Sequence, residues 1–588
     1  MLQNRPDELQ SIEIRNVFSL SVGGEPVKAK VFGEYAAAGC IEIPIGSAFA
    51  CDNPAIAAID AETGEVRGIT PGVTTITASD GHQMARQLVV VTNPVTHPKR
   101  ELRGAWISTV VNIDWPTKGV FEPERQRADY VYLLDELART GMNAVFVQVR
   151  PTSDSFHSSE YFPWSHWLTG KQGVAPSDGS DPLRFMIEEA HMRNMEFHAW
   201  INPYRVSMDT DVSQLDPSHP ARLHPEWVVP NNGKLYFNPG IEEAKNYIVA
   251  GVTEIVRKYD VDGIHMDDYF YPYPGPEAFD DAKQYGDYIN GGGTFSLGDW
   301  RRENVNSIVS DLHRAIKEFK PYVKFGISPF AIWRNKAIDP TGSDTDGEQN
   351  YDGLYADTRT WMKQGWLDYI APQNYWHFGS PAAAYEKVID WWTKEIEGEN
   401  DNSGKHDLHL YIGQAAYRVG RDDWTNPDQL PAQLRYNRDR GDQISGSIMF
   451  STSHLLANTL GVQDAVRTAY ARPALIPVMP WLAGDEPPSA PAIVELQRLD
   501  DAVRLSWRDS GDAKPAYYAV YRIPGEGTPD PNDTAQLLAT VRRTDDELQV
   551  FMDDTVDSDR ANAYAITALN RQHHESGMSN TVTVSTRP

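Results

Sequence analysis

Cysteine, basic residues and long apolar runs are all scarce in this sequence, and each shortage excludes a class of protein. Only two cysteines occur among 588 residues, so neither a disulfide-rich scaffold nor a thiolate metal site is expected. The 54 basic residues are outnumbered by 82 acidic ones, and the formal net charge of −28 disfavours nucleic acid and anionic lipid as partners. The same negative charge disfavours strongly acidic substrates, unless a local groove of basic residues offsets the negative potential of the whole protein. No apolar run approaches the roughly 20 residues that span a bilayer.

The cysteines and the start of the chain bear on where the protein works. Cys40 and Cys51 are far enough apart to bridge neighbouring strands, and two free buried thiols are at least an equal alternative. The first residues are polar and lack the basic-then-apolar pattern of a secretion signal. Either the protein stays inside the cell, or a leader has been removed ahead of Met1. The flanking modules described below favour the second, and therefore an extracellular or cell-surface location.

The chain is too long for one hydrophobic core, and its pattern changes twice. Residues 1–97 and 488–588 contain short alternating runs separated by turn residues, which is typical of β-sandwich domains. Residues 98–480 instead alternate strand signals with helix signals. We therefore predict three domains in these ranges.

Eight apolar segments of the middle block predict the strands of a (β/α)₈ barrel. They are residues 103–109, 144–150, 196–202, 263–267, 324–329, 369–373, 409–414 and 446–451. Amphipathic segments lie between most pairs, for example at 130–140, 182–193 and 242–259. Strand followed by helix, eight times over, is the pattern of this fold. The Gly- and Asp-rich stretch 273–298 is too polar for a core, so we expect a loop beside the active face.

Carboxylates and aromatic rings gather where the predicted strands end, most clearly after the fourth. There a short apolar run stops at Asp267 and Asp268, and Tyr269 follows directly. In such barrels the chemistry is placed at the C-terminal ends of the strands. Cleavage of a glycosidic bond needs carboxyl groups to move protons or attack, and flat rings that stack on pyranoses. The sequence therefore predicts a polysaccharide hydrolase.

Six short motifs of the middle block also carry a family resemblance. They are ELRGAW (101–106), QVRP (148–151), HAWINPYR (198–205), DGIHMDDY (262–269), SPF (328–330) and DYIAPQNYW (368–376). Together, and in order over roughly residues 100–470, they resemble the "family 10 glycosylhydrolase-like" barrels, which are distinct from the family 10 xylanases. The resemblance implies a barrel enzyme that acts on bacterial cell-wall or envelope glycans.

The flanking blocks resemble known β-sandwich modules. NPAIAAID (53–60), TGEV (63–66) and GVTTITA (72–78) resemble the bacterial immunoglobulin-like domain group 2. VRLSW (503–507), YYAVYR (517–522) and AYAITALN (563–570) resemble a fibronectin type III domain. In that fold Trp507 packs the core, and its alternation within a strand favours this role over sugar binding.

Asp267 is the predicted nucleophile or base, and several residues remain candidates for the general acid that would act with it. The motif 262–267 resembles the strand-four motif of α-amylase-type barrels, which implies that Asp267 faces the barrel mouth while Asp268 turns towards the loops. Those barrels place a Glu after strand five, where this chain has SPF. The remaining candidates are Asp268, Asp154 and Asp357, of which Asp357 is better placed to cap a helix. The structural alternative is an ion pair of Asp267 or Asp268 with Arg150 or Arg205.

The predicted substrate-binding residues come from the same strand ends and motifs. They are Arg103, Gln148, Arg150, His198, Asn202, Tyr204, His265, Tyr269, Trp333, Gln373, Tyr375 and Trp376. Among the rings, those just past strand ends (Tyr204, Tyr269, Trp333 and Trp376) are better stacking candidates than Trp106 and Trp200.

Two other functions remain open at this point. A non-catalytic glycan-binding surface protein would use the same aromatic face without a competent acid. A metal-dependent deacetylase would need His198, His265 and Asp267 to converge, although no spacing typical of a zinc site is present. We expect no metal or other cofactor, a polysaccharide or oligosaccharide substrate, and a monomer.

Overall fold

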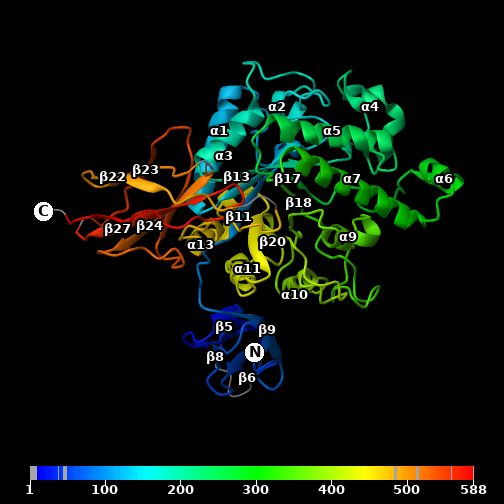
Figure 1. The fold of residues 1–588 in the computed structure, drawn as a ribbon. Helices are drawn as coiled ribbons and strands as arrows, with labels where there is room; N and C mark the ends of the chain where they lie inside the picture. The colour runs from blue at the N-terminus through cyan, green and yellow to red at the C-terminus, as the bar shows by residue number, and fades with distance from the viewer. Residues whose placement is uncertain are drawn as a thin grey trace.

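Eight parallel strands close into a barrel at the centre of the structure, a computed structural model that describes residues 9–36, 39–43, 49–482, 486–511, 515–557 and 559–586 (Figure 1). The strands are β11 (Leu102–Ile107), β12 (Ala144–Arg150), β13 (Glu196–Ile201), β17 (Gly263–Met266), β18 (Lys324–Ile327), β19 (Tyr369–Ile370), β20 (His409–Gln414) and β21 (Ile444–Met449). Adjacent strands are parallel throughout, and β21 closes the ring by pairing with β11. The predicted (β/α)₈ barrel and its eight strands are confirmed.

The barrel strands and helices form where the sequence pattern favours them. Every residue of β12 is buried, as expected for a parallel strand covered on both faces. The helices that cover the barrel are α1 (Pro123–Thr140), α3 (Pro182–Met192), α5 (Glu242–Lys258), α7 (Leu297–Phe319), α9 (Thr358–Lys363), α10 (Tyr385–Ile396), α11 (Gln429–Arg438) and α13 (Val462–Ala469). The predicted helices at 130–140, 182–193 and 242–259 are confirmed. Helix α1 begins earlier than predicted, with Pro123 in its first turn, and ends at Gly141 with a φ of +89°.

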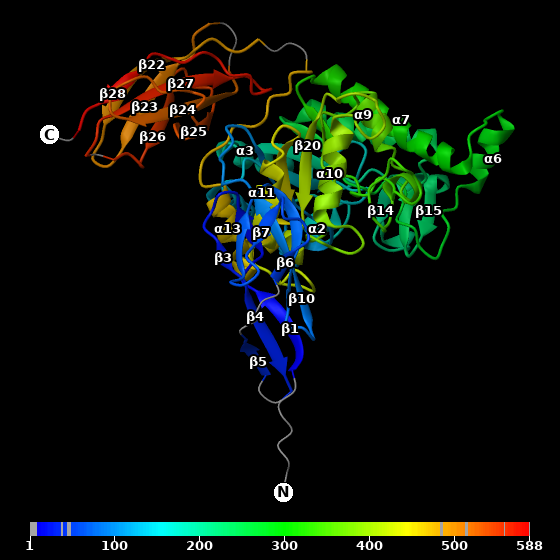
Figure 2. The same cartoon turned by 90° about the horizontal axis from the view of Figure 1, so that it is seen from below.

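Two insertions enlarge the C-terminal face of the barrel. Between β13 and α5 lies a small sheet of β14 (Arg205–Ser207), β16 (Lys234–Phe237) and β15 (Val228–Asn231), in that order, which the sequence analysis did not predict. Asn232 and Gly233 join β15 to β16 with positive φ at both residues, the geometry that a two-residue hairpin favours. The stretch 273–298 is not entirely a loop, because it contains the helix α6 (Ala282–Asn290), which has no buried residue and lies at the periphery (Figures 1 and 2).

The N-terminal segment forms three small sheets beside the barrel (Figure 2). Their strands are β1 (Leu9–Arg15), β2 (Ser19–Ser21), β3 (Val27–Lys28), β4 (Lys30–Tyr35), β5 (Gly39–Glu42), β6 (Phe49–Cys51), β7 (Ala57–Ile59), β8 (Glu65–Gly68), β9 (Gly72–Ser79) and β10 (Met84–Thr92). Cys40 is exposed, Cys51 is half-buried, and the two thiols are free rather than bridged. Asn93 joins this segment to the barrel by donating its backbone N–H to Asp439, at 3.1 Å.

The C-terminal segment forms two sheets that lie against the N-terminal end of the barrel. The first contains β22 (Ala492–Arg498), β23 (Val503–Arg508) and β26 (Gln549–Asp553), and the second contains β25 (Leu537–Arg542), β24 (Tyr517–Pro524), β27 (Asn562–Leu569) and β28 (Val582–Val584). Trp507 is fully buried in this segment, as predicted. His573 reaches the barrel and lies 2.8 Å from Glu196 at the start of β13. Within the described ranges, no helix has the length and apolar character that crossing a bilayer requires.

Candidate active site

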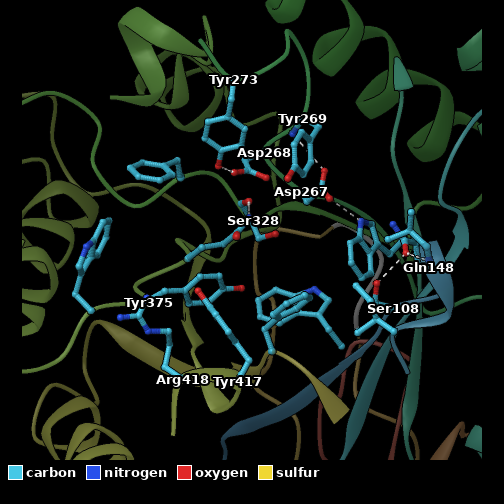
Figure 3. A pocket seen from close by; sticks show the side chains of 18 of the residues that line it. Ser108, Gln148, Asp267, Asp268, Tyr269, Tyr273, Ser328, Tyr375, Tyr417 and Arg418 are labelled. Atoms are coloured by element: carbon cyan, nitrogen blue, oxygen red, sulfur yellow. Dashed lines mark hydrogen bonds between the residues drawn. The ribbon is translucent and has the colours of Figure 1, made fainter. Parts of the chain in front are cut away.

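A cavity of about 600 Å³ lies at the C-terminal end of the barrel (Figure 3). It is lined by Trp106, Ser108, Val110, Ile113, Gln148, Trp200, Arg205, Asp267, Asp268, Tyr269, Tyr273, Ser328, Phe330, Gln373, Tyr375, Trp376, His377, Ser380, Tyr417, Arg418, Asp423, Trp424 and Phe450. Asp267 and Asp268 stand on one wall, and Tyr375, Tyr417 and Arg418 stand across from them. Aromatic rings and polar side chains share this lining, so the cavity offers both flat faces and hydrogen-bonding groups to a ring-shaped ligand.

Asp267 is held by neutral N–H donors rather than by a cation. The Asn202 amide donates to its two oxygens at 2.8 and 2.7 Å, and the Trp200 indole donates at 3.2 Å. Asn202 follows β13 and Asp267 follows β17, and these neighbouring parallel strands end at the same level because Ile201 pairs with Met266. The Asn202 oxygen in turn accepts from Gln148, at 2.6 Å. This relay fixes the orientation of the Asp267 carboxylate.

Asp268 is buried beside Asp267 and retains its proton more readily. Burial, followed by the neighbouring charge of Asp267, raises the pKa of Asp268 to about 7. The Tyr273 hydroxyl donates to Asp268 (Figure 3). Burial also raises the pKa of Asp267, while the charge of Arg205 and the Asn202 amide oppose that rise. The pair therefore places a protonated carboxyl group next to a charged one near neutral pH, with the charge on Asp267.

No other carboxyl group that lines the cavity, among the residues described, is free to act as an acid. Asp423 is the third, and it lies 2.6 Å from His377 and 3.4 Å from Arg418. Burial acts against ionisation of Asp423, yet the charge of His377 keeps its pKa below the ordinary value. Asp423 is therefore an ion-paired residue of the rim.

Two of the predicted acids lie outside the cavity. Asp154 is fully buried near Arg150, and its carboxylate has no hydrogen-bond partner among the described residues. Asp357 accepts from the backbone N–H of Thr360 at 3.2 Å and caps α9, the role that the sequence favoured. Of the three carboxyl groups that the sequence offered as an acid partner for Asp267, Asp268 is the one that lines the cavity. In the part of the chain that the structure describes, no ion pair joins Arg150 or Arg205 to Asp267 or Asp268.

Six of the predicted binding residues gather at the site. Gln148, Tyr269, Gln373, Tyr375 and Trp376 line the cavity, and Asn202 contacts Asp267 directly.

The two predicted histidines lie in the barrel interior, below the cavity. The Trp106 indole N–H donates to His265 at 3.0 Å, and the same ring nitrogen of His265 lies 3.1 Å from the Ser328 hydroxyl; Trp106 and Ser328 both line the cavity. His198 and His265 both contact the Tyr369 hydroxyl, at 3.0 and 3.1 Å. Burial holds the pKa of His265 well below its ordinary value, so this ring is neutral. The prediction that these rings bind substrate is not supported by their placement.

Three further predictions are wrong in placement because the side chains pack elsewhere. Arg103 lies at the opposite end of the barrel, where it donates to Glu101 at 2.7 Å and to the carbonyl of Arg472 at 2.6 Å. Arg150 is buried over the ring of Phe162. Tyr204 is fully buried in the core.

The stacking rings also differ from those predicted. Trp333 packs between Trp391 and Arg359 and does not reach the cavity. Trp106 and Trp200, which the sequence favoured as core residues, are buried in the barrel interior and also line the cavity. Both lie within barrel strands, and alternation along a strand does not show which interior residues reach the cavity.

Sequence reasoning missed several residues that complete the cavity. They are Ser108, Arg205, Tyr273, Phe330, His377, Tyr417, Arg418, Asp423, Trp424 and Phe450. The sequence analysis considered Arg205 only as a structural ion-pair partner of Asp267 or Asp268 and did not assign it to the site. Most of the others lie in loops, and their positions depend on how those loops fold over the barrel.

A triad of metal ligands is absent from the described residues, where no group of three His, Cys, Asp or Glu side chains is arranged to hold an ion. His198 and His265 contact Tyr369 in the barrel interior, while Asp267 faces the cavity. The three residues that the deacetylase alternative needs therefore do not share a site.

Comparison with known proteins shows the family of this chain. Residues 101–429 match the family model "Glycosyl hydrolase-like 10". The glycosyl hydrolase YngK of Bacillus subtilis is 46% identical over 496 residues, which cover 82% of this chain and 93% of YngK. The glycosyl hydrolase DigH of Escherichia coli is 39% identical over 395 residues, which cover 63% of this chain and 87% of DigH. Among solved structures, the PgaB glycoside hydrolase domain of Bordetella bronchiseptica aligns with a TM-score of 0.41 at 12% identity, over 63% of this chain and 99% of that domain. On the family match and these relatives, the chain belongs to the glycosyl hydrolase-like 10 family.

Proposed function

We propose that this protein is a glycoside hydrolase that cleaves a polysaccharide of the bacterial cell wall or envelope. Asp268 acts as the general acid, and Asp267 acts as the nucleophile or base. The observation that carries this proposal is the buried pair itself, in which one carboxyl group is protonated near pH 7 and its neighbour is held by N–H donors. The relatives named as glycosyl hydrolases support the same reaction class.

The roles follow from the two environments. A protonated Asp268 donates its proton to the glycosidic oxygen as the bond to the anomeric carbon breaks. Asp267, oriented by Asn202 and Trp200, attacks that carbon or removes a proton from the attacking water. Rings such as Tyr269 and Trp376 offer faces on which pyranoses stack.

We also propose that the flanking segments are accessory modules of a monomeric extracellular or cell-surface protein. The boundaries are those expected from the sequence: an immunoglobulin-like module at 1–97, the catalytic barrel at 98–480 and a fibronectin type III-like module at 488–588. The two sheets around the buried Trp507 support the last assignment.

A non-catalytic glycan-binding protein is the second candidate. One observation favours it: no carboxyl group stands directly at the end of β18, where Ser328 and Phe330 line the cavity instead. Such a protein would bind the same glycan through the aromatic walls and leave it intact.

The test is product analysis after incubation with bacterial polysaccharides, including peptidoglycan strands from which the peptides have been removed. We expect the parent to release oligosaccharides, and Asp267→Asn to lose at least about a thousandfold in rate while it stays folded and still binds. Asp287→Asn, the same substitution on the exposed face of α6, is the matched control and keeps parental activity. Binding without cleavage by the parent across the panel would establish the second candidate instead.

A further inference from the structure

A second cavity of about 590 Å³ adjoins the first and shares two residues of its wall. It is lined by Asn232, Gly233, Lys234, Tyr236, Tyr269, Pro272, Tyr273, Pro274, Gly275, Pro276 and Glu277. Tyr269 and Tyr273 line both cavities, and their rings contact edge to face at 5.4 Å. Because Tyr273 also donates to Asp268, a chain lying in this second groove passes directly beside the predicted acid.

The groove is held in shape before any ligand arrives. One wall is the hairpin tip between β15 and β16, and the other is the loop that follows Tyr271. The Asn231 amide donates to the carbonyl of Glu277 at 3.1 Å, and the backbone N–H of Asn232 donates to the Glu277 carboxylate at 2.7 Å. Pro272, Pro274 and Pro276 stiffen the loop because each fixes its own φ. A preformed groove binds a rigid ligand with little ordering cost.

The one cation that lines this groove, Lys234, has no partner among the described residues. Lys234 is half-buried, and among the described residues its ammonium group has no hydrogen bond and no ion pair. The one carboxylate of the groove, Glu277, is turned to the backbone of Asn232. Burial and the positive charge of Arg205 both lower the pKa of Lys234. An unpaired cation beside a second cation, in a chain of net charge −28, is a place that an anion stabilises.

We propose that this groove is a second sugar subsite that selects a pyranose bearing a carboxylate, with Lys234 as the residue that binds the anion. The half-buried rings of Tyr269 and Tyr273, which line the groove, support the sugar ring, and the neighbouring unit of the same glycan extends to Asp267 and Asp268. This inference rests on the proposed function for the cleavage that follows binding. Lys234, together with the charge of Arg205 in the adjoining cavity, makes the potential here less negative than that of the molecule as a whole.

The carboxylate can come from a uronic acid or from a lactyl ether on an amino sugar, and the test separates these sources. Binding is measured by calorimetry with the full chain carrying Asp267→Asn, so that the glycan stays intact. The probes are peptide-free peptidoglycan strands, the same strands with their carboxylates converted to methylamides, and oligogalacturonate. Lys234→Gln is compared with Lys283→Gln, which removes the same charge from an 80% exposed side chain on α6.

We expect the carboxylate form to bind about tenfold more tightly than the methylamide, and Lys234→Gln alone to abolish that difference. Tighter binding of peptide-free strands identifies a lactyl carboxylate, and tighter binding of oligogalacturonate identifies a uronate. Two outcomes overturn the inference. One is equal affinity for the two forms of the strands together with no binding of oligogalacturonate that depends on Lys234; the other is a carboxylate preference that survives Lys234→Gln. Absence of cleavage by the parent contradicts the hydrolase proposal alone, since the binding comparison still decides the groove.

Discussion

Carboxyl groups are buried to a similar extent at the two ends of the barrel, but their pKa values shift in opposite directions. Glu196 and Asp262 at the N-terminal end are 2% and 6% exposed, and Asp267 and Asp268 at the C-terminal end are 7% and 4% exposed. Burial by itself raises the pKa of all four. Only the second pair ends with a raised pKa, so burial does not decide the outcome.

The partners of the carboxylates account for the difference. The Lys324 ammonium donates to Glu196 at 2.6 and 2.8 Å, and His573 lies at 2.8 Å. These groups outweigh burial and bring the pKa of Glu196 well below its ordinary value. At the other end the donors are the neutral groups of Asn202, Trp200 and Tyr273. Cationic partners stabilise the fold, whereas neutral partners leave a carboxyl group able to exchange its proton during a reaction.

The largest expected effect is on the cleavage rate, and it comes from a substitution at the C-terminal end of the barrel. Asp268→Asn removes the proton donor and keeps the shape of the side chain, so we expect the rate on a cleaved glycan to fall by about 10²–10⁴-fold. The free energy of unfolding should not decrease, because the substitution removes a buried carboxyl group whose negative charge would repel that of Asp267. Steady-state kinetics and denaturant unfolding measure the two quantities. Retention of the parental rate would assign the acid to another residue.

The next largest effect is on stability, and it comes from a substitution at the N-terminal end of the barrel that should leave activity unchanged. Glu196→Gln leaves Lys324 as an uncompensated buried charge, so we expect the free energy of unfolding to fall by about 3–5 kcal/mol. Adding Lys324→Met should restore part of that loss, and this double variant is the control for the charge argument. The folded fraction should keep its turnover rate because Glu196 lies at the far end of the barrel. A parallel loss of turnover in folded protein would contradict the division between the two ends.

A smaller effect is expected in the pH dependence of stability, where Asp268 and Glu196 should contribute with opposite signs. The raised pKa of Asp268 means that the folded state binds more protons than the unfolded chain, whose carboxyl group titrates near 3.8. Its contribution to stability is therefore complete below about pH 4 and is lost as the pH rises to about 7. Glu196 has the opposite sign, with a contribution present above its unfolded value of 4.5 and lost in acid.

Unfolding measured from pH 4 to 8 checks this expectation. The stability of the parent should decline relative to Asp268→Asn across this range, and turnover of the parent should fall as the pH passes about 7, where Asp268 loses its proton. A constant difference between the two proteins would contradict the assigned pKa.

Much of the barrel could be predicted from the sequence because its strands are continuous apolar runs that end in polar residues. Asp267 and Asp268 were found in this way, since they follow β17 directly. Arg103 was misplaced although its position carried a signal: it is the second residue of β11, so it belongs to the N-terminal end.

The rest of the site depends on long-range folding that local patterns do not encode. Tyr417 and Arg418 follow β20 and reach the cavity only because the barrel closes. The hairpin that forms one wall of the second groove did leave a local signal, since Asn232 and Gly233 separate two short alternating runs. Its contact with Glu277 is a tertiary feature that the sequence alone does not indicate.

The contact between His573 and Glu196 also sets an order of assembly during synthesis. Glu196 belongs to the third barrel strand, and His573 leaves the ribosome after all eight strands have emerged. Arg571, which contacts Asp260 in the loop before β17, arrives at the same late stage. Until then the acidic end of a nascent barrel lacks these basic partners and faces water or a chaperone. Completion of the C-terminal sheets is thus the step that brings these partners to the barrel, although none of the described residues of these sheets lines its cavity.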